Sequence, residues 1–193
     1  MLLRSIAFVV FIVAPLTEHA TFSADQRPLG GITGLVRVLG DSTVQSELSL
    51  DKNQERLAKE LVELLRRVRD GKAQSIAKDK ITKSLSDEQF ERLEQVHWQR
   101  LGGRAILEPK VRDRLGIDEG QKKKLDDAKA INTVQHAKML DFLRRARFRS
   151  REAMEKYKQG YRDAADKRLL GVLTEKQRAQ LKRLLGKPFR PAA

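Results

Sequence analysis

The 193-residue chain contains no cysteine, so disulfides and thiolate metal sites are excluded, although this does not by itself assign a compartment. Aromatic residues are also scarce, at 5% of the sequence, whereas charged residues make up 34%. This composition is typical of thin, two-layer helix packing and not of a thick core.

Sequence patterns of enzymes are missing as well. The chain has no serine or cysteine nucleophile spaced with its base, no zinc-protease helix and no phosphate-binding glycine loop. No carboxylate lies three or four residues from His136, and His97 has only Glu94 at such a distance. We therefore expect no catalytic residue, no metal site and no cofactor, and we do not expect an enzyme.

Long apolar runs are absent too. The longest extends from Ile6 to Leu16 after Arg4, about eleven residues where a bilayer span needs roughly 20. It predicts a secretory signal peptide over residues 1–20, a periplasmic or secreted protein, and no stable membrane span after processing. An uncleaved N-terminal anchor or an interfacial segment is the alternative.

A helix-start pattern recurs four times along the rest of the chain. In each copy an N-cap residue precedes a glutamine by three positions, the arrangement of a capping box, in which the cap and the glutamine bond each other's backbone amides. We expect these glutamines to act in capping alone. The four predicted caps are Asp51 with Gln54, Ser86 with Gln89, Asp118 with Gln121, and Thr174 with Gln177.

The four units pair into a larger duplication, since the segment that begins at Val44 matches the one that begins at Val111. The sequence therefore predicts an all-α fold of extended helical hairpins, with one all-helical domain at 42–187 made of two related halves, 42–108 and 109–187. Glycines and Pro28 predict a flexible linker over 21–41, and 188–193 is expected to be a frayed tail.

Several further helices follow from local signals. Ser42 with Gln45 predicts a short capped helix through Leu48, and Asp51 begins a helix that we expect to reach Ser75 or beyond. Pro109 predicts a short helix over 109–115. The helical pattern then runs without proline over about 118–169, which predicts one long helix with a narrow apolar seam, interrupted at Gln135 and around Arg149-Ser150.

Basic residues exceed acidic ones, 40 to 26, so the net charge is +14 and the surface is expected to attract anions. The densest positive charge is interleaved with phenylalanine, which predicts a contact surface for acidic, partly apolar segments. The alternative is a solvated helix face on which the arginine stems cover their apolar neighbours. Trp98 is expected to be a packing anchor. The predicted contact residues are Phe142, Arg144, Arg145, Arg147, Phe148, Arg149 and Arg151.

A leader followed by helices that open with Leu-Thr-x-x-Gln resembles the Spy/CpxP family of envelope proteins. The motif is complete at Leu173-Thr174-Glu175-Lys176-Gln177 and nearly so at Leu85-Ser86-Asp87-Glu88-Gln89. The resemblance implies a periplasmic helical protein, commonly a curved antiparallel dimer. The family includes ATP-independent chaperones that hold clients on a basic concave face, stress-response regulators and metal-binding relatives. This chain has four units in place of two and no metal-ligand histidine pattern.

These observations favour an exported, non-enzymatic protein that binds unfolded or acidic polypeptides in the envelope without nucleotide, with a chaperone-like or envelope-stress role. One alternative is a basic helical module for nucleic acid or another polyanion, which the leader and the lack of a base-reading motif disfavour. Another is a dimeric structural or scaffold protein that pairs through a coiled coil of the 118–169 segment. A homodimer is compatible with the first and the third hypotheses.

Overall fold

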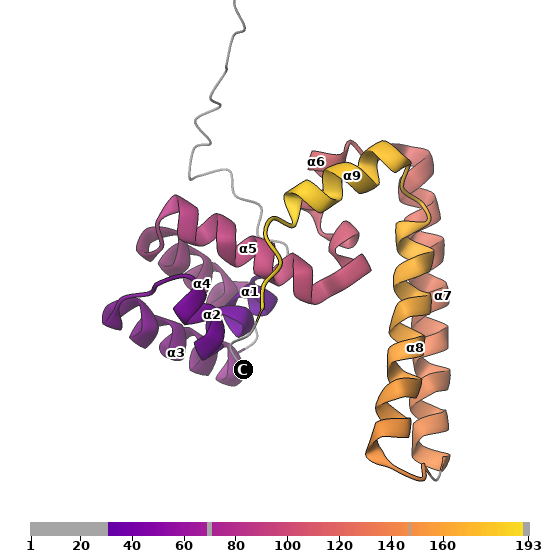
Figure 1. Ribbon diagram of the computed structural model, residues 1–193. Helices are drawn as coiled ribbons and strands as arrows, with labels where there is room; N and C mark the ends of the chain where they lie inside the picture. The colour runs from indigo at the N-terminus through magenta and orange to yellow at the C-terminus, as the bar shows by residue number, and fades with distance from the viewer. Residues whose placement is uncertain (1–30, 69–70, 147, 191–193) are drawn as a thin grey trace, which may run out of the picture.

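The computed structural model describes residues 31–68, 71–146 and 148–190, so the predicted signal peptide and residues 21–30 of the predicted linker lie outside the described residues. The described part contains nine α-helices and one 3-10 helix, which confirms the all-α fold (Figure 1). No described residue belongs to a β-strand, and none of the described helices is both long and apolar enough to span a bilayer. The elements are α1 (Ile32–Leu39), α2 (Ser42–Glu47), α3 (Lys52–Arg67), α4 (Gly71–Ser84), α5 (Asp87–Leu101), η2 (Gly102–Leu107), α6 (Pro109–Leu115), α7 (Glu119–Arg145), α8 (Arg151–Leu170) and α9 (Glu175–Leu184).

Helix α1 lies at the centre of the first hydrophobic cluster and contacts α3, α4 and α5. Gly34 allows this approach, because a Cβ at that position would lie 2.5 Å from Cε1 of His97 on α5. The predicted flexible linker is therefore wrong for residues 31–41, since a glycine there serves close helix packing and not flexibility. The buried side chains of α1 are Ile32, Leu35, Val36, Val38 and Leu39.

A second hydrophobic cluster is built from the end of α5, η2, α6, the first turns of α7, the end of α8 and α9. Trp98 is only 3% exposed in this cluster, which confirms it as a packing anchor. Phe90, Leu93 and Val96, earlier on α5, belong to the first cluster. Helix α5 thus carries side chains into both cores and holds them together.

The predicted long helix over 118–169 is wrong, because the segment forms two antiparallel helices. Helix α7 ends at Arg145, Ala146 adopts an extended conformation, and α8 starts after Ser150, whose hydroxyl accepts from the amide of Ala153 at 3.1 Å. Ser150 therefore caps α8, and the interruption of the apolar seam at Arg149-Ser150 is the start of a new helix. Figure 1 shows the resulting α7–α8 hairpin extending well beyond the two clusters.

Smaller boundaries also differ from the prediction. Helix α3 ends at Arg67, where Val68 turns extended, and does not reach Ser75. The cap of α2 is Asp41 and not Ser42, and Gln45 instead donates to the carbonyl of Leu39 at 2.9 Å from a buried position. The helix over 109–115 is confirmed.

The described part of the predicted tail is not frayed. Gln99 of α5 donates to the carbonyls of Leu185 and Lys187, and its Oε1 accepts from the amide of Phe189 at 2.7 Å. The Phe189 ring packs against the first cluster. Residues 186–189 therefore run along α5 and tie the C-terminal segment to the N-terminal core. The duplication of the two halves and the two-layer packing stay predictions.

Candidate functional site

All four predicted capping boxes are confirmed, each with both of its hydrogen bonds. In α9, for example, the Thr174 hydroxyl accepts from the amide of Gln177 at 3.2 Å, and Gln177 Oε1 accepts from the amide of Thr174 at 3.0 Å. Such bonds satisfy amides that a helix start leaves without an internal partner. The four starts are therefore determined by residues within four positions of each other.

The glutamines do more than cap, contrary to our expectation. Gln54 and Gln89 donate to each other's Oε1 at 2.9 and 3.2 Å, and their remaining amide bonds reach the carbonyls of Ser84 and Leu48. Each glutamine thus joins the start of its own helix to the end of the segment that precedes the other helix. The pair locks α3 and α5 together at their N-termini.

Gln121 and Gln177 form a second pair with the same pattern. They donate to each other at 2.7 and 3.0 Å, and to the carbonyls of Val172 and Leu115 at 3.1 and 3.2 Å. Gln121 is only 9% exposed. This pair joins the base of the α7–α8 hairpin to α6 and α9, so it positions the hairpin on the rest of the molecule.

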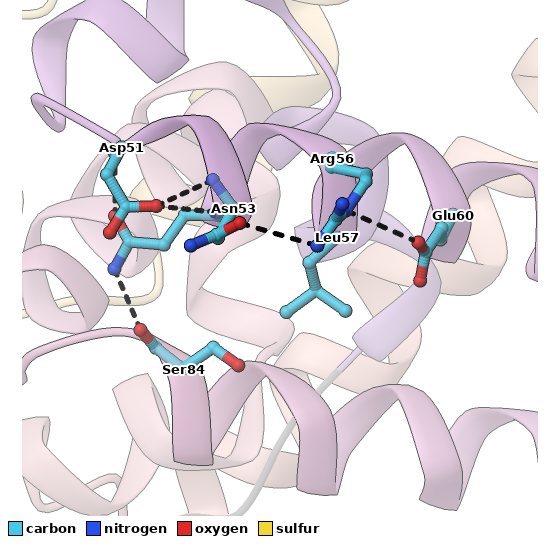
Figure 2. Close-up of a pocket in the computed structure, with 7 residues that line it drawn as sticks. Asp51, Asn53, Arg56, Leu57, Glu60 and Ser84 are labelled. Carbon is cyan, nitrogen blue, oxygen red and sulfur yellow. Dashed lines mark hydrogen bonds and ion pairs between the residues drawn. The ribbon is translucent and has the colours of Figure 1, made fainter.

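A shallow recess of about 330 Å³ lies beside the first pair and is lined by polar side chains (Figure 2). Figure 2 shows Asp51 bonded to the helix start and Arg56 reaching Asn53 and Glu60, at 3.3 and 4.0 Å. These groups bond within the recess, and the carbonyl of Ser84 accepts from Gln54. The recess thus lies beside the capped start of α3, and its polar groups bond one another.

The predicted contact residues gather at the tip of the α7–α8 hairpin, with the exception of Arg147, which lies outside the described residues. Phe142 packs on Phe148 and on Tyr157, with ring centroids 6.0 and 4.7 Å apart. Despite these contacts Phe142 and Tyr157 remain 46% and 40% exposed. We call Phe142, Phe148 and Tyr157 the tip cluster.

Arginines surround the tip cluster. Arg145 forms an ion pair with Asp141 one turn earlier on α7. Arg144, Arg149 and Arg151 are exposed and form no ion pair within the part of the chain that the structure describes. The tip therefore presents aromatic surface together with exposed arginines that form no ion pair with the described residues. Tyr157 was not predicted, because fifteen residues separate it from Phe142 and only the hairpin turn brings the two rings together.

A second shallow feature, which we call the hairpin groove, lies between α7 and α8 toward the base of the hairpin. Its volume is about 730 Å³. Its apolar part includes Ile131, whose side chain is 48% exposed, and its rim carries basic side chains. The lining residues are Lys124, Asp127, Ala128, Ile131, Ala164, Lys167, Arg168, Gly171 and Val172.

The seam between α7 and α8 is partly polar, and Asn132 determines its register. The Asn132 amide donates to the carbonyl of Ala165 at 3.3 Å, its Oδ1 accepts from Arg168, and its backbone carbonyl accepts from the Tyr161 hydroxyl at 2.7 Å. The His136 ring stacks on Tyr161, with centroids 5.7 Å apart. These bonds hold a seam that has few large apolar side chains.

A buried ion pair and a buried histidine lie away from the hairpin. Lys110 of α6 forms a buried ion pair with Glu94 of α5 and lies 5.8 Å from the Phe90 ring and 5.9 Å from the Trp98 ring. Burial lowers the pKa of His97, whose Nε2 has no hydrogen-bond partner among the described residues. Each of these groups is buried between packed helices, where its contacts contribute to the packing.

The described residues offer no cluster of three His, Asp or Glu side chains that could hold a metal ion. The hairpin presents aromatic rings and basic groups on its surface. No protein-family model, no curated protein and no solved structure matches this chain.

Proposed function

We propose that the protein is exported and binds unfolded or acidic polypeptide segments in the envelope, without nucleotide and without catalysis. Its role would be chaperone-like or part of an envelope-stress response, similar to that of the Spy/CpxP family. The observation that supports this function best is the tip cluster, where exposed rings lie among unpaired arginines on a hairpin far from both cores.

The chemistry of the tip suits weak and reversible holding. Arginines attract acidic segments and raise the encounter rate, an effect that salt screens over about 10 Å at 0.1 M. Covering a half-exposed aromatic ring contributes on the order of 1 kcal/mol, at about 25 cal/mol per Å² of apolar surface. Three or four such contacts amount to about 3–4 kcal/mol, which corresponds to a dissociation constant of roughly millimolar, so a client would be released without an energy source.

Suppression of client aggregation tests the proposal. The purified protein at near-stoichiometric ratio should reduce the light scattering of a denatured, acidic client, and high salt should weaken the effect. The double variant Phe142→Ser with Phe148→Ser should lose most of the suppression. Ile76→Ser is the matched control, because Ile76 is an exposed apolar residue of α4, 39% accessible, away from the hairpin.

Two outcomes would contradict the proposal. One is the absence of suppression at any ratio. The other is binding to duplex DNA at physiological salt that is tighter than binding to an acidic polypeptide, since the positive charge would then serve a nucleic acid.

A further inference from the structure

The hairpin groove and the tip cluster lie on one face of the hairpin. Ile131 in the groove and Phe142 at the tip are eleven residues apart on α7, which is about three helical turns. Ala164 in the groove and Tyr157 at the tip are seven residues apart on α8, about two turns. On each of the two helices the groove residue and the tip residue therefore lie on the same side.

This shared face is long and only partly polar. From Lys124 to Phe142 it covers 18 residues of α7, or about 27 Å. Between its two ends α8 presents Gly160, where an added Cβ would meet no atom within 4 Å. The face is therefore open at Gly160 as well as at the groove, and its length matches one additional helix of about five turns.

The charge along the face is mainly positive. Among the described residues Lys124 and Lys167 have no carboxylate within ion-pair distance, and Asp127 is the acidic residue of the groove lining. A second copy of the same hairpin would bring like charges together, which disfavours self-association through this face. Charge complementarity instead favours a partner with acidic residues beside an apolar stripe.

The apolar floor also selects the conformation of that partner. An extended segment laid on Ile131, Ala164 and Val172 would turn some backbone amides and carbonyls toward side chains that cannot bond them. A helix satisfies those groups internally and presents side chains alone. Adding a third helix to two antiparallel ones is also a packing arrangement that ordinary helix ridges and grooves allow.

We propose that this face binds an amphipathic α-helix whose apolar stripe is flanked by glutamate and aspartate. The inference rests on the proposed function and deepens it, since it specifies that the preferred segments of a client are acidic and helix-forming. The apolar stripe lies in the hairpin groove and reaches the tip cluster, and the acidic flanks lie beside Lys124, Lys167 and Arg168.

Binding of a designed peptide tests this inference. The probe is a fluorescent peptide of about 18 residues, long enough to cover the face, with leucine at helical spacing and glutamate on both flanks. A scrambled peptide of the same composition, which has the same charge and no apolar stripe, is the control ligand. The amphipathic peptide should bind about tenfold more tightly than the scrambled one, and its circular dichroism should become helical on binding.

The variant Ala164→Arg distinguishes binding in the groove from simple charge attraction. The substitution places a long side chain in the groove and adds a positive charge, so attraction increases while the floor is blocked. We expect it to weaken binding of the amphipathic peptide about tenfold. Ala137→Arg is the matched control, because Ala137 is an exposed residue of α7 on the side away from α8, and it should leave binding unchanged.

The inference is overturned if the two peptides bind equally, or if Ala164→Arg binds as tightly as Ala137→Arg. It is also overturned if phosphatidylglycerol vesicles bind in an Ala164-dependent manner while the peptide does not, because the occupant would then be a lipid surface. If aggregation is still suppressed in a Phe142-dependent manner in any of these cases, the proposed function stands and the helical occupant is wrong.

Discussion

Replacing Gln121 and Gln177 with alanine, singly and together, distinguishes capping from pairing. If each glutamine only caps its helix, each substitution should cost about 1 kcal/mol of unfolding free energy, and the costs should add. The two side chains, however, share two hydrogen bonds of 2.7 and 3.0 Å, and each donates one more to a backbone carbonyl.

The shared bonds set the expected magnitude. Gln121→Ala removes the weak cap contact, both shared bonds and the bond to Val172, which at roughly 0.5–1.5 kcal/mol for each strong bond gives about 3 kcal/mol. Gln177→Ala should cost a similar amount. The double variant should cost less than the sum by about 1–2 kcal/mol, because the two shared bonds are lost in both single variants.

Urea unfolding followed by tryptophan fluorescence measures these costs, since Trp98 is the single tryptophan and is buried in the same cluster as the hairpin base. Thr174→Ala is the control for a cap alone and should cost about 1 kcal/mol without changing peptide binding. Costs that add within about 0.3–0.5 kcal/mol for the Gln121 and Gln177 variants would refute the pairing and leave capping as their role.

Three further predictions concern the packing around α5, with a substitution in α8 as a comparison for one of them. Glu94→Gln should cost about 3–5 kcal/mol, because it leaves the buried Lys110 without its carboxylate, and adding Lys110→Met should recover part of that loss in urea unfolding. Gly34→Ala should cost about 1–3 kcal/mol of unfolding free energy, since the new methyl would lie 2.5 Å from the His97 ring. Gly160→Ala in α8, where no atom is near, should instead stabilise the protein by up to about 1 kcal/mol. Equal melting temperatures for the two variants would contradict this. Burial lowers the pKa of His97, so the unfolded state takes up a proton as the pH falls below about 6.5 while the folded state does not, and stability should fall from pH 7 toward lower pH. His97→Gln should remove that part of the pH dependence, and an unchanged slope would show that His97 is not its source.

Helix starts were predictable because a capping box is a local structure. Thr174 and Gln177 bond each other whatever the rest of the chain does, and the same holds at Ser86 and Gln89. Burial of Trp98 was likewise predictable from its large aromatic side chain.

The hairpin turn was less accessible to prediction. Neither proline nor glycine marks residues 146–150, and the local signal there is Ser150, which by sequence alone is compatible with a break in the seam as well as with a helix cap. Once the turn is known, Phe142 near the end of α7 and Tyr157 in the first two turns of α8 are seen to face each other across the hairpin. The phenylalanines and arginines of the tip could therefore be named from the sequence, whereas Tyr157 and the hairpin groove could not.

The sequence alone determined where four helices begin, that the protein is all-helical and that its surface is basic, because caps, apolar spacing and charge act over a few neighbouring residues. Tertiary structure decided that α1 is a core helix, that the 118–169 segment folds back on itself and that the four glutamines form two pairs. Each of these depends on contacts between residues far apart in the chain, such as Gly34 with His97, Asn132 with Arg168, and Gln121 with Gln177. Local propensity leaves such contacts open, and the burial of apolar surface together with the need to bond buried amides selects among them.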